Sequence, residues 1–106
     1  ERVYDAAWSG DDRLLPDGAL AAVGSSVDLN TGLTANTIGS PRLTAVWQDP
    51  EFDPAQSAFY YVRVLQIPTA RHSLLDKLAL GNEDIDTRRP DTIQERAYTS
   101  PIWYRP

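Results

Sequence analysis

The sequence predicts a mainly β protein, an antiparallel immunoglobulin-like β-sandwich with one short helix. Aromatic and β-branched residues alternate along residues 58–68 and recur along residues 92–104, and Gly, Pro and Asn divide the rest into short segments. Five or six strands can be distinguished, whereas a sandwich of this kind usually has about seven. We therefore expect an incomplete sandwich, with an apolar edge open to self-association or strand exchange.

The first third of the chain contains weak strand signals separated by a loop. Residues 2–9 alternate moderately and predict a strand, and the Gly- and Pro-rich residues 10–25 predict a surface loop. Residues 26–37 predict an edge hairpin, because Asn30 and Gly32 tolerate positive φ between two short strands.

Two stronger strand candidates follow, joined by a turn. Residues 42–49 alternate well and predict a central strand, and residues 49–57 predict a turn in which Asp49 and Asp53 accept local backbone hydrogen bonds. Residues 58–68 are apolar on both faces, so we expect burial on both sides and a partner for the Arg63 guanidinium.

A short helix and an interrupted strand complete the chain. The run SLLDKLALG predicts a helix with Ser73 as its N-cap and Gly81 just beyond its C-terminus. After the charged residues 82–91, residues 92–106 predict a last strand. Pro101 interrupts this strand and implies an edge, a bulge or a change of partner.

Composition limits the classes of protein to which this chain can belong. The 106 residues suit one domain, and a chain that lacks Met and begins at Glu1 is expected to be part of a larger protein. The formal charge of −5 argues against a nucleic-acid partner, and no apolar run approaches the ~20 residues of a membrane span. The absence of Cys excludes disulfides and thiolate sites and leaves the compartment open.

Two groups of polar residues invite a chemical role. His72 is the sole histidine and could act as a general base, but no second His or paired carboxylate accompanies it in the sequence, which favours a structural role. Asp49, Glu51 and Asp53 have the alternate spacing of calcium ligands but lack the central Gly and distal Glu of a calcium loop, so a plain turn is favoured.

A further acidic group interleaved with arginines could bind a cation or keep a loop soluble, and solubility is favoured. Its members are Glu83, Asp84, Asp86 and Asp91, with Arg88 and Arg89 between them.

Three consecutive long polar residues precede the last aromatic strand and could project towards a neighbouring domain. Together with the pair before the predicted helix they form the predicted docking residues: Arg71, His72, Gln94, Glu95 and Arg96. An exposed aromatic platform for glycans is the alternative. It requires Trp8, Trp47 and Trp103 on one open face, and core packing of the tryptophans, Trp47 in particular, is favoured.

The segments AAWSG, NTIGSPRLTAVWQDPEFDPAQSAFYYVRVLQIPTARHS and TIQERAYTSPIWY resemble the C-terminal end of the domain-of-unknown-function family 3604. Arg71 and Ser73 match the family pattern, whereas Ala70 and His72 stand where a Pro and a Trp are usual. The resemblance implies a longer parent with a PHP-like (polymerase and histidinol phosphatase) metal-dependent hydrolase or phosphoesterase domain. Its divalent metal would be held upstream, and no ligand of that metal maps onto this chain.

The prediction is therefore that residues 1–106 are a single, non-catalytic, β-rich C-terminal accessory domain or fragment. It would dock on the parent's hydrolase domain and stabilise it, without a cofactor of its own and without contact to nucleic acid or membrane. The alternative is an independent ligand-binding or adhesion module, most plausibly for glycans.

Overall fold

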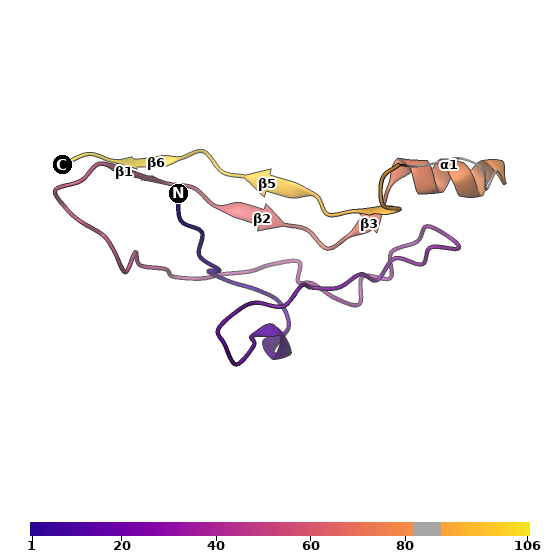
Figure 1. The fold of residues 1–106 in the computed structure, drawn as a ribbon, viewed down its shortest axis with the longest axis horizontal. Coiled ribbons are helices and arrows are strands. Elements are labelled where there is room, and N and C mark those ends of the chain that lie inside the picture. The colour runs from indigo at the N-terminus through magenta and orange to yellow at the C-terminus, as the bar shows by residue number, and fades with distance from the viewer. Residues whose placement is uncertain (82–87) are drawn as a thin grey trace.

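The computed structural model describes residues 1–81 and 88–106. Its most regular part is a long antiparallel pair of segments, residues 58–70 and 92–104, which runs along the long axis of the molecule (Figure 1). We call this pair the ribbon. It consists of three two-stranded sheets: β1 (Ala58–Tyr60) with β6 (Ile102–Tyr104), β2 (Arg63–Leu65) with β5 (Arg96–Tyr98), and β3 (Thr69–Ala70) with β4 (Thr92–Ile93).

The first interruption of the ribbon lies beside a proline. From the pair Tyr60–Ile102 to the pair Arg63–Tyr98, one segment advances three residues and the other four, so one extra residue lies on the side of Pro101. Proline has no N–H to donate to a ladder, and such a position is where a bulge is tolerated. The interruption that the sequence predicts at Pro101 is therefore confirmed.

The second interruption compensates the first. From the pair Leu65–Arg96 to the pair Thr69–Ile93, the first segment advances four residues and the second three, which places the extra residue on the side of Pro68. The two shifts cancel, so the outer sheets β1–β6 and β3–β4 share one register. Each shift falls where a missing backbone donor prevents a continuous ladder.

Residues 1–57, here called the N-terminal layer, lie below the ribbon as an irregular second layer (Figure 1). Their regular structure is limited to one turn of 3-10 helix, η1 (Asp11–Arg13), and two isolated bridges, Leu14–Leu20 and Val27–Thr34. The strands predicted at residues 2–9 and 42–49 do not form. An alternating pattern defines which side chains share a face, but a strand also needs a partner for its backbone groups.

The predicted hairpin at residues 26–37 is present as a tight turn with a single bridge. The Gly32 N–H donates to the Asp28 carbonyl oxygen over 2.7 Å, and the Asp28 N–H donates to the Leu33 carbonyl oxygen over 2.8 Å. Gly32 adopts a φ of 72°, as expected, whereas within this segment Asn36, and not Asn30, has a positive φ.

The helix α1 spans His72–Leu80 and ends as predicted, because Gly81 adopts a left-handed φ of 58° and its N–H bonds to the Lys77 carbonyl oxygen. Its start differs from the prediction. Arg71 occupies the N-cap position without a side-chain cap, and Ser73 lies inside the helix with a buried hydroxyl that has no partner among the described residues.

The two layers do not enclose a core. Leu74, 3% exposed, is the only buried residue in the described part of the chain. The radius of gyration is 18.5 Å, against about 13 Å for a compact domain of this length. The accessible surface is 8765 Å², against about 5,900 Å² for a compact monomer of this mass. Large apolar side chains therefore remain in contact with solvent along the whole molecule.

These findings correct the predicted architecture. The described residues are mainly β with one α-helix, as predicted, but they form three small two-stranded sheets and no immunoglobulin-like sandwich. The burial predicted on both faces of residues 58–68 is also wrong, since Phe59, Val62 and Leu65 are each more than half exposed. Of the two layers, one is the ribbon, and the N-terminal layer lacks the strand pairing that would make it a sheet.

Candidate functional site

The predicted docking residues fall into two groups. The first group, Arg71 and His72, lies where the ribbon meets α1. The Arg71 N–H donates to the Asp91 carbonyl oxygen over 2.8 Å, and Arg71 Nε donates to the Pro90 carbonyl oxygen over 3.0 Å. His72 is exposed at the first position of the helix. Arg71 therefore ties the start of α1 to the segment that returns to the ribbon, and His72 remains open to solvent.

The second group, Gln94, Glu95 and Arg96, follows β4 on the opposite segment of the ribbon. Glu95 accepts a hydrogen bond at its carbonyl oxygen from the Gln66 N–H over 3.0 Å, and Arg96 begins β5 opposite Leu65. Gln94, Glu95 and Arg96 are all exposed. Pairing of β3 with β4 brings both groups to the same end of the ribbon, although they are about twenty residues apart in the sequence.

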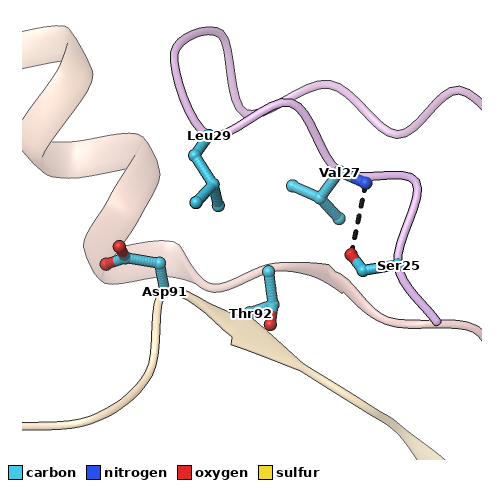
Figure 2. A pocket seen from close by; sticks show the side chains of 5 residues that line it. All are labelled: Ser25, Val27, Leu29, Asp91 and Thr92. Carbon is cyan, nitrogen blue, oxygen red and sulfur yellow. Dashed lines mark hydrogen bonds between the residues drawn. The ribbon is translucent and has the colours of Figure 1, made fainter. Parts of the chain in front are cut away.

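A depression of about 310 Å³ lies beside this end of the ribbon (Figure 2). It is lined by Ser25, Val27, Leu29, Asp91 and Thr92. The Val27 N–H donates to Ser25 Oγ over 3.3 Å, which fixes the wall formed by the hairpin segment. Val27 and Leu29 supply its apolar wall, and Asp91 is the one carboxylate that lines it.

A second depression, of about 410 Å³, lies between the ribbon and the N-terminal layer, where aromatic side chains meet. Trp47 lies 5.0 Å from Tyr4 and 6.2 Å from Tyr60 between ring centroids. Phe52 meets Tyr104 edge-on at 4.9 Å. These contacts attach the N-terminal layer to one face of β1 and β6, although Trp47 keeps 41% of its surface exposed, so its predicted packing in a core is only partial.

Hydrogen bonds to carboxylates complete this attachment. The Tyr60 hydroxyl donates to Asp49 Oδ2 over 2.7 Å, a bond that lowers the pKa of Asp49 and raises the pKa of Tyr60. The Tyr4 hydroxyl donates to Glu51 Oε2 over 2.8 Å, which raises the pKa of Tyr4, and the same oxygen pairs with Arg2.

The turn at residues 49–53 uses its acidic side chains locally. Asp49 Oδ1 accepts the Glu51 N–H over 2.9 Å, and Asp53 Oδ1 accepts the Ala55 N–H over 2.9 Å, as predicted for this turn. No group of three or more His, Cys, Asp or Glu within residues 1–81 and 88–106 could hold a metal ion. Glu83, Asp84 and Asp86 of the predicted acidic group lie outside the described residues.

The opposite face of the ribbon carries an aromatic strip that the sequence analysis did not identify. Phe59 lies 5.1 Å from Trp103 and 6.3 Å from Tyr61, which lies 6.1 Å from Tyr98. All four side chains are exposed, Trp103 to 63% and Phe59 to 54%. The signal for the strip is the alternation at residues 59–61, which places Phe59 and Tyr61 on one face and Tyr60 on the other.

The aromatic strip bears on the predicted glycan platform. Trp103 belongs to the strip, whereas Trp47 contacts Tyr60 on the opposite face of the ribbon. The three tryptophans therefore do not share one open face, as that platform requires. Two arginines accompany the strip, since Arg63 pairs with Tyr98 and alternation puts Arg96 on the same face.

Comparison with known proteins identifies the family. A family model described as "Protein of unknown function (DUF3604)" matches residues 1–106, so the chain belongs to this family. Neither the curated proteins nor the solved structures contain a match to the chain. In the described part of the chain, no helix is long and apolar enough to cross a membrane.

Proposed function

We propose that this member of the DUF3604 family is the non-catalytic C-terminal part of a larger PHP-like metal-dependent hydrolase or phosphoesterase. In this proposal residues 1–106 dock on the hydrolase domain of the same protein and stabilise it. The divalent metal belongs to that domain, and the substrate is converted there. The observation that carries the proposal is the surface of the chain, which is far larger than that of a compact domain of this mass and includes many exposed large apolar side chains.

The size of the excess indicates what kind of contact would remove it. The accessible surface exceeds that of a compact monomer by the difference between 8765 Å² and about 5,900 Å², or about 2,900 Å². A permanent interface buries roughly 2,000 to 5,000 Å² or more over both partners, and its centre is apolar and aromatic. An excess of about 2,900 Å² on this chain corresponds to about 5,800 Å² over both partners, which lies at the large end of permanent interfaces and supports an intramolecular docking role.

The distribution of the exposed side chains supports the same role. Val46 is fully exposed, Leu80 and Ile102 are exposed to 72% and 73%, and the aromatic strip is open along the ribbon. Exposed apolar side chains thus occur in the N-terminal layer, in α1 and in the ribbon. A small ligand would cover one of these regions, whereas a neighbouring domain could cover all of them.

The predicted docking residues contribute the polar part of this interface. Arg71 and His72 lie at the start of α1, and Gln94, Glu95 and Arg96 lie on the adjacent strand segment. Polar and charged groups at the rim of an apolar interface set orientation and exclude wrong contacts. We assign them the role of orienting the chain on the hydrolase domain while the aromatic strip supplies the apolar contact.

The test uses the full-length protein with the variants Trp103→Ser and Arg96→Glu. Both should lower the melting temperature of the hydrolase domain and its phosphoesterase activity, while the metal content of protein that remains folded stays unchanged. Arg88→Glu, a charge reversal at an exposed arginine outside the docking residues and outside the strands of the ribbon, is the matched control and should change neither. Unaltered stability and activity in both docking variants would refute the proposal, as would stoichiometric metal and turnover in residues 1–106 alone.

A second candidate, a glycan-binding module, is favoured by one observation. The exposed strip of Trp103, Phe59, Tyr61 and Tyr98 offers consecutive ring faces on which sugar rings could stack. A saturable shift of tryptophan fluorescence during titration of the full-length protein with soluble polysaccharides, lost in Trp103→Ser, would favour this candidate. Docking predicts no such shift, because the strip would be covered.

A further inference from the structure

Residues 42–48 have no regular secondary structure and few backbone hydrogen bonds. No backbone hydrogen bond joins residues 43–48 to any other residue that the structure describes, and only Arg42 is held, by the Ser40 hydroxyl. The sequence nevertheless has the alternation of a strand, which would place Leu43, Ala45 and Trp47 on one side of it. A segment with this pattern carries a row of donors and acceptors that a partner strand would satisfy.

The position of this segment is already fixed at one point. Trp47 contacts Tyr4 and Tyr60, so one face of residues 42–48 lies against the ribbon side of the molecule. Val46, on the other face, is fully exposed at 103%, and Leu43 is 48% exposed. The segment is thus held in place by one side chain while its outer face and its backbone remain open.

We propose that residues 42–48 become a β-strand by adding to an open sheet edge of the hydrolase part of the same protein. This inference rests on the proposed docking function and specifies how part of the interface is made. Strand addition joins a backbone with unpaired groups to an exposed sheet edge, and the alternating side chains then enter the contacts on both faces. The added strand would supply the sheet pairing that the N-terminal layer lacks.

The observations favour the hydrolase part over a second copy of the chain. Two copies paired through residues 42–48 would cover one strand each, whereas Phe59, Leu80 and Trp103 would stay exposed elsewhere. A partner that is large enough to cover these regions also has room for a sheet edge. The excess surface of about 2,900 Å² needs such a partner, because one strand pairing cannot bury it.

Residue-resolved hydrogen exchange on the full-length protein tests the proposal. Antiparallel pairing bonds alternate residues to one neighbour, so protection should alternate along residues 43–48, on either the odd or the even positions. Proline substitution checks the same geometry with a matched pair, Thr44→Pro and Ala45→Pro. Only the variant at a protected position should lower the melting temperature, because its neighbour directs its N–H away from the partner.

Each outcome decides a separate question. If residues 43–48 exchange as fast as an unstructured peptide while Trp103→Ser and Arg96→Glu still lower the melting temperature, strand addition is wrong and docking stands. If residues 43–48 are unprotected and neither of those variants changes stability or activity, both proposals fail. If the alternating protection disappears when the protein is diluted to the monomer, the partner is a second copy and the assigned occupant is wrong.

Discussion

Residues 42–48 and residues 58–65 have similar alternating patterns but different structures. The second segment is paired along β1 and β2, whereas the first has no backbone partner among the described residues. The paired segment owes its structure to residues 96–104, which lie beside it at a compatible register. Alternation therefore selects the faces of a strand, whereas the strand itself exists only when another segment accepts its hydrogen bonds.

The ribbon and the N-terminal layer also differ in how their backbones are bonded. The ribbon is held by backbone ladders, and the N-terminal layer is attached to it by side chains such as Trp47, Tyr4 and Phe52. Attachment through side chains does not require a regular backbone, but it leaves backbone N–H and C=O groups of the layer without partners in a ladder. The layer is therefore the part of the chain whose structure should depend most on the partner.

The largest expected effect comes from Gly39→Ala, which would separate the two layers. Gly39 has a φ of 82°, and a Cβ there would lie 2.5 Å from Cγ2 of Ile67, a β-branched side chain with little freedom to move. We expect about 3 kcal/mol lower stability, from backbone strain and overpacking together. Urea unfolding of the full-length protein measures it.

The control is Gly18→Ala, at the same φ of 82° but with nothing within 4 Å of the new Cβ. It isolates the backbone strain, and we expect about 1 kcal/mol. Equal losses for the two variants would show that the contact between Gly39 and Ile67 does not hold the layers together.

Next in size is Trp47→Ala, which removes the ring between Tyr4 and Tyr60. Aromatic pairs contribute about 0.5 to 1.5 kcal/mol each beyond the area they bury, so we expect a loss of about 2 kcal/mol. Trp47→Phe keeps a ring in place and should lose less than half of that. If both variants unfold at the same urea concentration as the parent, the aromatic contacts seen here do not attach the N-terminal layer.

A smaller effect is expected within the ribbon from Thr99→Val. The Thr99 hydroxyl accepts the Val62 N–H over 2.9 Å at the bulge before Pro101. Replacing the hydroxyl by a methyl group removes this acceptor and should cost about 1 kcal/mol. Thr99→Ser retains the oxygen and should restore most of the stability. Exchange of the Val62 amide, measured in the three proteins, must follow the same order if the bond closes the bulge.

The smallest effect concerns pH. The Tyr60 hydroxyl lowers the pKa of Asp49 below its usual value of 3.8 in the folded chain. The stabilisation is therefore fully present above the unfolded pKa and is lost as the pH falls through the lowered folded value. Asp49→Asn should flatten the dependence of stability on pH below about pH 4. An unchanged pH profile in Asp49→Asn would show that this bond does not contribute.

Features with short-range causes could be predicted from the sequence. Gly81 ends α1, Pro101 interrupts the second segment of the ribbon, and Asp49 and Asp53 accept backbone bonds within their turn. Each outcome is decided by a φ angle, a missing N–H or an acceptor two residues away. The predicted start of the helix was wrong, because Arg71 bonds to Pro90 and Asp91, which is a contact between residues distant in the sequence.

The candidate site shows the same difference between features with short-range causes and features that depend on distant residues. The predicted residues at the start of α1 and after β4 occupy one end of the ribbon, but the sequence offered no sign that β3 and β4 would bring them there. The aromatic strip was missed for the same reason, because Phe59 and Tyr61 meet Tyr98 and Trp103 only through the pairing of distant segments.

The mainly β character, a short helix with its glycine stop, and the interruption at Pro101 follow from the sequence alone. Tertiary structure alone decided which segments pair, where the register shifts compensate, and that the apolar faces stay open. The physical reason is range: dihedral preferences and local hydrogen bonds act over a few residues, whereas pairing and burial depend on what another part of the chain presents.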